Sequence, residues 1–487
     1  MNIVTRQSLK YTIVGYFGSL LGILSTFFLF THDLEFYGKL RFILPTAQMF
    51  VPVVVFGISF SNVKFFQMMQ REGKHHNFLS LSLLAVGFNF IIFCIGFWSY
   101  GLLVPQYYQS EIWRLKFIIL PLVLILALSA VFNKYISNYK RIAISNIFEN
   151  VFPKLANIGA FSLFFFFSIS ETNAYRFFIL VFFVALVGYY IYANRLEIIN
   201  FDFSTSYIKK EKRWKPILDY SFYGFLGNLG SYLALSIDNV MISEGIGFEQ
   251  NGVYSTIYSI VALVSLPAMG LYNISAPIIN SHFEQGTMKA LNQYHQKTSF
   301  NLMAVGLVLW SCLVVGFPYL THYMPKSGAA ILSAQPLVWI LGVATLFELA
   351  TGFNSHIISM SKYYRFNIVV MLILAGFTIG LNYFFIQYTH LGIMGVAIAY
   401  ATSLTLFNLT KITFNYYKFK VFPLTVKMLY AILLAGGIIA VVCVLPDFSI
   451  PFLNLVYKPL VVLCLFFLGN LWLKFYPISH LTKVFRK

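Results

Sequence analysis

Acidic residues and cysteines are both scarce in this chain of 487 residues. Aspartate and glutamate together number 16, cysteine occurs 4 times, and only 10% of the residues are charged. Typical soluble domains carry about 25% charged residues. Hydrophobic residues make up 59% of the chain, and the mean hydropathy is +0.75. This composition excludes a soluble globular domain and indicates a membrane protein.

Sequence motifs for catalysis and metal binding are absent as well. The chain contains no Walker-type glycine loop, no HExxH and no nucleophile elbow, and its nearest approach to a paired-carboxylate motif, Asp33-Leu34-Glu35, is better explained as a loop. We therefore expect no enzymatic activity, no metal and no cofactor. The cysteines lie in apolar stretches, where packed thiols without disulfides or a metal cluster are the simplest expectation. They are Cys94, Cys312, Cys443 and Cys464.

Fourteen apolar stretches have roughly the length needed to span a membrane, about 20 residues each. The connections between them reach at most about 22 residues, which leaves no room for an extramembrane domain. Any function must therefore be carried out within the bilayer, and transport is the default. The stretches cover approximately residues 10–30, 42–60, 78–98, 116–133, 147–168, 176–194, 217–238, 252–277, 298–320, 332–355, 366–387, 391–410, 426–445 and 456–475.

The positive charges divide unequally between the two sides of these stretches. In the set of alternate connections that includes the N-terminus lie 26 of the 34 lysines and arginines, and 7 lie in the other set. The positive-inside rule then predicts that both termini are cytoplasmic. The net charge of +18 is scattered over many segments, which argues against nucleic acid as a partner. The densest basic run, 209–215, either contacts anionic lipid headgroups or docks another protein.

An internal repeat divides the chain. Residues 11–20 and 220–229 both follow the pattern Tyr-[Thr/Ser]-x-x-Gly-[Tyr/Phe]-x-Gly-x-Leu, and Gly38 and Gly252 precede the second apolar stretch of each copy. The match opens two sets of six stretches, so it predicts two lobes that run in the same direction across the membrane. We predict an all-α polytopic protein with an N-lobe (1–213), a C-lobe (214–424) and an accessory pair of spans with a tail (425–487).

Small and polar residues follow one face of the first helix of each predicted lobe. In the first they include Ser19, and in the second Asn228 and Ser231, at spacings of three and four residues. Close helix packing explains such a face. Lining of a hydrated cavity between the lobes explains it as well, and the occurrence of the stripe in both halves adds weight to this second explanation without displacing the first.

Lys154 is the clearest ionisable residue inside a predicted span, where a charge is costly. Pro153 before it frees a backbone carbonyl, and Asn157 lies three residues later. The ammonium group either reaches back to the headgroups or faces a cavity that binds an anionic substrate. Arg6 and Lys10 lie at the cytoplasmic mouth of the first span.

Arg41 lies at the outer mouth of the second span and, like Arg6 and Lys10, is suited to phosphate contacts as well as to topology. Glu348 lies within the tenth span, with His356 near the end of that span. A buried carboxylate there could exchange a proton, bind sodium or pair with Lys154. Asp238 closes the seventh span, either as an interfacial cap or as a second group for ion coupling.

Two segments resemble a known family. Residues 236–242, Ser-Ile-Asp-Asn-Val-Met-Ile, followed by Gly-Val-Tyr-Ser at 252–255, resemble the D-x-x-M-I…G-x-Y-[SA] region of polysaccharide repeat-unit flippases. Residues 381–386 and 391–399 are similar to the asparagine-containing span and the G-x-x-G-x-A-x-A helix start of the same proteins. These are the Wzx-type (O-antigen and capsule) members of the multidrug/oligosaccharidyl-lipid/polysaccharide (MOP) exporter superfamily.

The resemblance implies alternating access of two six-helix lobes around a cationic cavity, in a monomer of the bacterial inner membrane. Its substrate would be an oligosaccharide on a polyprenyl pyrophosphate, its accessory spans would shape a groove for the lipid tail, and its partners would be membrane lipid and the glycan polymerase or glycosyltransferase machinery. Transport would use no cofactor, with Na⁺ or H⁺ as the coupling ion if it is coupled. A cation-coupled small-molecule exporter of the same fold is the main alternative. An intramembrane enzyme is disfavoured because the outer loops are short.

Overall fold

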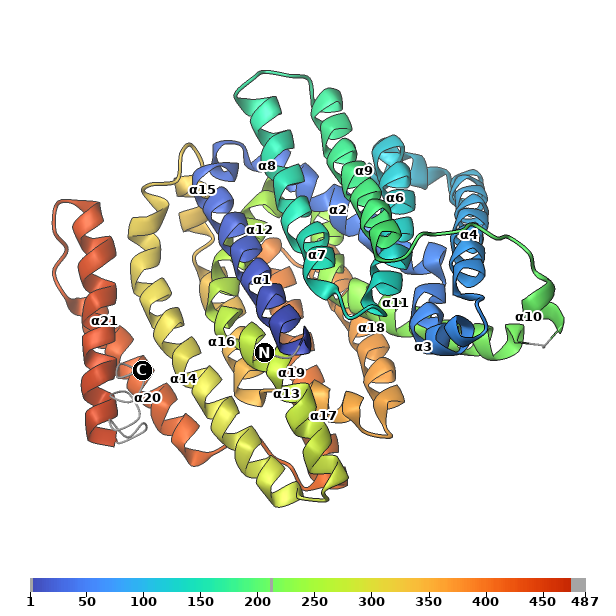
Figure 1. Cartoon of the computed structure of the whole chain (residues 1–487). Helices are drawn as coiled ribbons and strands as arrows, with labels where there is room; N and C mark the ends of the chain where they lie inside the picture. The colour runs from blue at the N-terminus through green and yellow to red at the C-terminus, as the bar shows by residue number, and fades with distance from the viewer. Residues whose placement is uncertain (1–2, 211–212, 474–487) are drawn as a thin grey trace. The chain divides into compact units, whose positions relative to one another are not determined.

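The computed structural model describes residues 3–210 and 213–473, and this part of the chain is helical without any strand (Figure 1). The all-α prediction is confirmed. Each of the fourteen apolar stretches coincides with helical structure, because a backbone in hydrocarbon must satisfy its hydrogen bonds within its own segment. The long helices are α1 (Ile3–Phe28), α2 (Leu34–Val55), α4 (His75–Leu103), α6 (Lys116–Ser137), α8 (Phe152–Phe165), α9 (Glu171–Leu196), α11 (Trp214–Gly245), α12 (Phe248–Val261), α13 (Leu266–Glu284), α14 (Met288–Thr321), α16 (Pro336–Thr351), α18 (Tyr364–Tyr388), α19 (Ile393–Phe419), α20 (Val426–Val444) and α21 (Pro451–Leu473).

Shorter helices connect or extend these elements. Within the described residues, eleven segments are long and apolar enough to cross a membrane, or twelve if the bent pair α16 and α17 forms one span. The count of fourteen spans and the cytoplasmic position of both termini stay predictions. The shorter α-helices are α3 (Ile58–Arg71), α5 (Glu111–Arg114), α7 (Ile142–Asn146), α10 (Ser206–Lys210), α15 (Gly328–Ser333) and α17 (Asn354–Met360).

Several spans are interrupted where the sequence predicts continuous helices. Phe56 and Gly57 both adopt left-handed backbone angles, which separates α2 from α3. A Cβ atom on Gly57 would lie 1.9 Å from the Ser221 carbonyl oxygen of α11, so this break brings two backbones into contact. A π-helical turn, Ile147–Val151, joins α7 to α8. Such turns occur mostly within α-helices and are frequent at functional sites.

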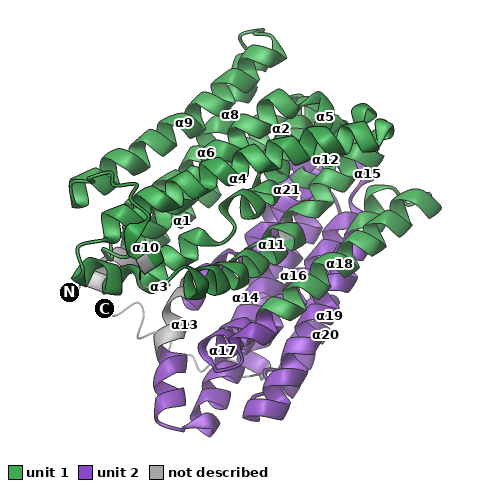
Figure 2. Ribbon diagram, turned by 90° about the vertical axis from the view of Figure 1, so that its right-hand side faces the viewer, with its two compact units in different colours: residues 1–255, 368–396 green, residues 256–367, 397–487 purple. Residues whose placement is uncertain are grey.

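The chain forms two compact units, coloured separately in Figure 2. Unit 1 contains residues 1–255 and 368–396, and unit 2 contains residues 256–367 and 397–487. Unit 1 contains α11 because this helix packs along α2 and α3. The units therefore divide the chain differently from the predicted lobes, which stay a prediction.

In unit 1, α2 packs against α6 and α11, and α8 packs against α9. Aromatic side chains fill the space between these helices. The Phe36 ring of α2 stacks on Phe164 of α8 at 4.0 Å between centroids and on Tyr175 of α9 at 5.7 Å. This packing fixes the position of α8 relative to α2.

Two glycines form the crossing of α2 and α12. A Cβ atom on Gly38 would lie 1.8 Å from the Phe248 carbonyl oxygen, and one on Gly252 would lie 2.1 Å from the Leu34 carbonyl oxygen. The Asn251 side chain donates a hydrogen bond of 3.0 Å to the Gly38 carbonyl. Gly38 of α2 therefore packs against the backbone of α12, and Gly252 of α12 packs against the backbone of α2.

Unit 2 is organised around α14, which packs against α13, α16, α20 and α21. At one end of α14, the buried residues Ile279, Leu291 and Phe353 form a core that holds α13, α14 and α17 together. The accessory helices α20 and α21 pack on each other as well as on α14. The last two predicted spans are therefore an integral part of this unit.

Candidate functional site

Lys154 lies near the middle of the column formed by α7, the π-turn and α8. Pro153 occupies the first turn of α8, and the Asn157 side chain donates a hydrogen bond of 2.7 Å to the Pro153 carbonyl oxygen. The lysine stem lies along α1, because a Cβ atom on Gly22 would be 3.2 Å from Lys154 Cε. The side chain is half-buried. The intramembrane location of Lys154 stays a prediction.

Arg41 of α2 is the second cation at this place. Its charge acts on Lys154 directly, although the two residues are more than 100 positions apart. Within the described residues neither side chain has a carboxylate in ion-pair contact, and the Arg41 Nε group is buried without a hydrogen-bond partner. Two cations without a counter-charge favour an anionic ligand, since an uncompensated buried charge is costly.

A small polar cavity adjoins Pro153 in the same unit. Its volume is about 110 Å³. Its polar lining comes from four helices and the π-turn, and the Asn133 side chain donates a hydrogen bond of 3.3 Å to Glu149 there. Polar groups and aromatic faces together are suited to sugars. The polar and aromatic lining residues are Gln48, Ser129, Asn133, Phe148, Glu149, Phe182, Tyr189 and Tyr232.

The polar stripe of α11 is largely occupied by helix packing. Ser231 Oγ donates a hydrogen bond of 2.8 Å to the Gly227 carbonyl and lies 3.3 Å from the Met371 sulfur of α18. At the other end, Ser221 bonds to Ser61 of α3 at 2.8 Å. These contacts support the packing explanation for those serines.

The remaining predicted cavity residues are less tightly placed. Ser19 and Asn228 are half-buried, and Lys10 is exposed. The side chain of Arg6 lies outside the described part of the structure. The structure therefore brings Arg41 and Lys154 together.

Asp238 does not end its helix as the sequence suggested. Helix α11 continues to Gly245, and the Asp238 side chain is buried at 6% exposure. Tyr254 of α12 donates a hydrogen bond of 3.0 Å to one carboxylate oxygen, and Asn382 of α18 donates one of 2.7 Å to the other. The Asn382 carbonyl oxygen is buried and has no hydrogen-bond donor in the described part. Asp238 thus lies at the junction of three helices, in a cluster of oxygen atoms.

Glu348 of α16 lies in unit 2. It is accessible, and the charge that acts on it within this unit is that of Lys411 of α19. Lys411 is only 5% exposed and donates a hydrogen bond of 2.8 Å to Ser355. The predicted twelfth span ended at residue 410, which would place Lys411 in a cytoplasmic connection. Helix α19 continues to Phe419, so Lys411 lies within a helix that is long and apolar enough to cross a membrane.

An apolar groove of about 780 Å³ runs between α14, α16 and α20 in unit 2. Trp310, Trp339 and Met428 contribute to its walls, and Gly436 leaves one side open. Cys443 lines it as well and is exposed, as is Cys464 of α21, so the expectation of packed thiols is wrong for these two. A groove with an almost wholly apolar lining fits a hydrocarbon chain.

A family model described as polysaccharide biosynthesis protein matches residues 4–279, more than half of the chain. The chain belongs to the polysaccharide biosynthesis protein family. The matched region includes Arg41, Lys154 and Asp238. Family membership confirms the resemblance found in the sequence.

One curated relative is the uncharacterized membrane protein EpsK of Bacillus subtilis (strain 168), with 27% identity over 201 residues. The match covers 40% of this chain and 38% of EpsK, so the chain spans less than two thirds of that relative's length.

Two solved structures have a fold similar to that of this chain. The lipid II flippase MurJ, in an inward closed conformation, has a TM-score of 0.71 and 15% identity, covering 95% of this chain and 98% of MurJ. An inward-facing multidrug resistance MATE family transporter of the MOP superfamily has a TM-score of 0.64 and 13% identity, covering 85% of this chain and 94% of the transporter. The polysaccharide family member therefore has the MOP fold and is a multi-pass membrane protein, which is consistent with the bacterial inner membrane. The named neighbours are flippases and transporters, in agreement with a function that is not enzymatic.

Proposed function

We propose that this protein moves an oligosaccharide linked to a polyprenyl diphosphate from the cytoplasmic to the outer leaflet of the bacterial inner membrane. The observation that carries the proposal is the pair of uncompensated cations, Arg41 and Lys154, inside unit 1. A diphosphate would supply the missing negative charge. The guanidinium group suits bidentate contact with phosphate oxygens, and the ammonium group adds a point charge.

The glycan would lie against the polar cavity beside Pro153. This cavity offers amide, carboxylate and phenol groups together with aromatic faces, all within reach of the first residues of α8. The cavity is small, so it would hold part of a sugar and orient the group next to the diphosphate. The remaining sugars would lie outside this cavity.

The apolar groove of unit 2 would take the polyprenyl chain. Helix α20, one of the two accessory helices, forms a wall of this groove. The flippase MurJ covers 95% of this chain and the MATE transporter covers 85%, so the lipid-cargo protein matches more of it. These observations favour a lipid-linked cargo over the small-molecule exporter. Such a cargo also implies glycosyltransferases and a glycan polymerase as functional partners.

Alternating access of the two lobes would be coupled to a cation at Asp238. The buried carboxylate and the unpaired Asn382 carbonyl supply hard oxygen ligands, which suit Na⁺, and the carboxylate alone suits a proton. Glu348 is the second candidate, but the adjacent Lys411 already compensates its charge.

The proposal is tested with the full chain reconstituted in liposomes that contain a fluorescent polyprenyl-diphosphate sugar. Leaflet exchange is measured with and without Na⁺ and H⁺ gradients. We expect exchange to depend on the protein and to be at least about 10-fold slower in Arg41→Gln and Lys154→Gln, since a hydrogen bond to a charged group contributes about 1.5–3 kcal/mol.

Arg176→Gln is the matched control, because Arg176 is an exposed cation of the same unit. It should exchange the lipid at the wild-type rate. A folded Arg41→Gln/Lys154→Gln double variant with wild-type exchange would remove the pair from the mechanism. Gradient-driven efflux of organic cations without lipid exchange would assign the protein to the exporters.

A further inference from the structure

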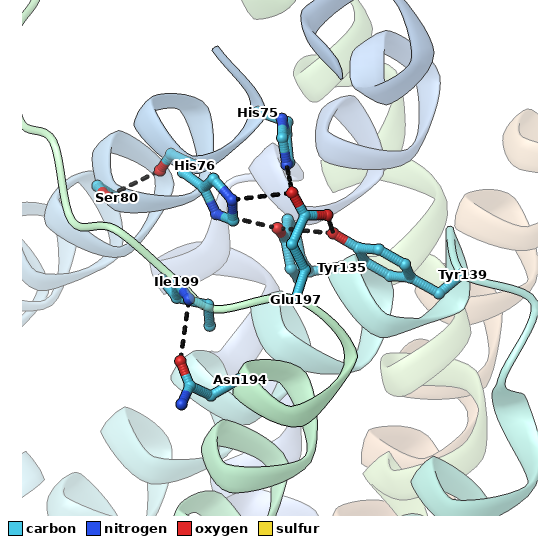
Figure 3. Close-up of polar contacts among 8 residues, drawn as sticks. All are labelled: His75, His76, Ser80, Tyr135, Tyr139, Asn194, Glu197 and Ile199. Atoms are coloured by element: carbon cyan, nitrogen blue, oxygen red, sulfur yellow. Dashed lines mark hydrogen bonds and ion pairs between the residues drawn. The ribbon is translucent and has the colours of Figure 1, made fainter. Parts of the chain in front are cut away.

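A second cluster of polar side chains lies in unit 1 where α4 begins and α9 ends, separate from the cation pair. The imidazole Nε2 atoms of His75 and His76 lie 2.8 Å and 3.2 Å from the same carboxylate oxygen of Glu197 (Figure 3). The ligand atoms of all three residues lie within 4.8 Å of one another. Sequence motifs did not indicate this cluster.

The convergence of two consecutive histidines is unusual for a helix. Adjacent residues of an α-helix point about 100° apart, so their side chains normally diverge. Here both rings turn toward one oxygen atom, with ring centroids 4.1 Å apart. His75 is the first residue of α4 and the Glu197 carboxylate comes from the residue after α9, so tertiary contact places the groups.

Hydrogen bonds hold the segment after α9 against the first turns of α4. The Asn77 side chain donates to the Asp202 and Ser204 carbonyls, both at 2.9 Å, and Ser80 Oγ accepts from the Asp202 amide at 3.2 Å. The cluster is therefore positioned by its surroundings. It also remains accessible, because the Glu197 side chain is 36% exposed.

Two tyrosines of the α6 end complete the network. Tyr139 donates a hydrogen bond of 2.7 Å to the second Glu197 oxygen, and its hydroxyl lies 3.0 Å from that of Tyr135. The Tyr135 hydroxyl lies 3.4 Å from Nδ1 of His76.

The protons of this network can be counted. Since Tyr139 gives its proton to Glu197, the contact between the two tyrosines needs the proton of Tyr135. The contact from Tyr135 to His76 then needs a proton on Nδ1 of His76. When the proton of a neutral imidazole is on Nδ1, the Nε2 atom carries a lone pair, and here that lone pair faces the Glu197 carboxylate, which is also an acceptor. A cation between Nε2 and the carboxylate satisfies every contact, and so does a doubly protonated His76.

We propose that His75, His76 and Glu197 bind one divalent transition-metal ion of the zinc class. Imidazole nitrogen and carboxylate oxygen are preferred zinc ligands, and tetrahedral sites with bond lengths of about 2.0–2.2 Å place neighbouring ligand atoms about 3.3 Å apart. The two observed separations, 2.8 Å and 3.2 Å, are shorter than this value by about 0.5 Å and about 0.1 Å, so binding would move His75 outward slightly. The route from Nδ1 of His76 through Tyr135 and Tyr139 to Glu197 forms the outer shell that fixes tautomer and orientation. The fourth position is left for water.

The ion would fasten the start of α4 to the end of α9, and through the tyrosines to the end of α6. An ion that binds the folded state and not the unfolded state would raise the stability of this end of unit 1. The role is structural or regulatory, since neither of the cations proposed for transport belongs to the cluster.

The test uses the purified full chain without a histidine tag, stripped with a chelator and then titrated with Zn²⁺, with metal content and calorimetric affinity as readouts. Co²⁺ absorption reports tetrahedral nitrogen and oxygen ligands independently of transport. We expect one ion per chain, and binding at least about 100-fold weaker in His76→Gln and Glu197→Gln. Tyr139→Phe should weaken binding by about 10- to 100-fold, the usual effect of an outer-shell partner.

His390→Gln is the matched control, because His390 is an exposed histidine outside the cluster. It should bind Zn²⁺ as the wild type does. If the wild type takes up no more Zn²⁺ than the His76→Gln/Glu197→Gln double variant, the proposal is overturned. Tyr139→Phe retains all three ligands, so its result decides the matter even where a ligand variant fails to fold.

Discussion

The crossing of α2 and α12 leads to a quantitative prediction for Gly38→Ala. The added Cβ would lie 1.8 Å from the Phe248 carbonyl oxygen, whereas real Cβ atoms essentially never come closer than 3.0 Å, so the helices must separate by about 1.2 Å. Overpacking of this kind costs about 1–3 kcal/mol. The separation also stretches the hydrogen bond from Asn251 to the Gly38 carbonyl, which contributes about 0.5–1.5 kcal/mol. Replacing a helical glycine by alanine returns about 1 kcal/mol.

The net expectation is a loss of about 1–3 kcal/mol in the free energy of unfolding. It is measured by denaturant titration of the purified protein in detergent, followed by intrinsic fluorescence. Gly252→Ala should behave alike, because its Cβ would lie 2.1 Å from the Leu34 carbonyl oxygen. Gly96→Ala of α4 is the control, since its Cβ meets nothing within 4 Å, and it should be neutral or stabilising. The reasoning is refuted if Gly38→Ala is as stable as Gly96→Ala.

Three further changes test the other sites. Gly436→Trp should fill the apolar groove and slow lipid exchange without changing the melting temperature. The control is Gly437→Trp, whose site is equally open but lies outside the groove, and this variant should exchange the lipid at the wild-type rate. Equal exchange rates for the two variants would exclude the groove from binding the lipid tail. Asp238→Asn should raise the Na⁺ or H⁺ concentration for half-maximal transport at least about 10-fold, equivalent to about 1.4 kcal/mol, and unchanged ion dependence would exclude Asp238. Lys411→Met should lower the free energy of unfolding by about 1–3 kcal/mol, because Ser355 and Glu348 lose their partner. Adding Glu348→Gln to this variant should recover part of the lost stability. If the double variant recovers none, the interaction between Lys411 and Glu348 is contradicted.

Hydropathy was sufficient to predict the helices, because spanning segments need only length and apolar composition. It could not predict where they are interrupted. The break at Phe56 and Gly57 depends on the approach of α11, a helix more than 150 residues away in sequence. The Gly38 and Gly252 positions were noticed in the repeat, but their mutual contact required the structure.

The candidate site was predicted unevenly for a similar reason. Lys154 could be identified from sequence because a charge in the middle of an apolar stretch is conspicuous. Lys411 was missed because it follows directly after a predicted span, where lysines are common. The extension of α11 beyond Asp238 was missed too, since polar residues near a span end usually mark the interface. Convergence of His75 and His76 on Glu197 depends on three helix ends and has only one local signal, the adjacent histidines.

The π-helical turn before α8 has a mechanical consequence. Such a turn holds one residue more than an α-helical turn, so the column from α7 to α8 carries a surplus residue just before Lys154. Moving that surplus along the column would shift the register of the intervening helix by one residue and rotate it by about 100°. Lys154 would then turn away from Arg41 while the hydrogen-bonded backbone stayed intact. In the proposed function, that rotation would separate the two cations and so release the diphosphate.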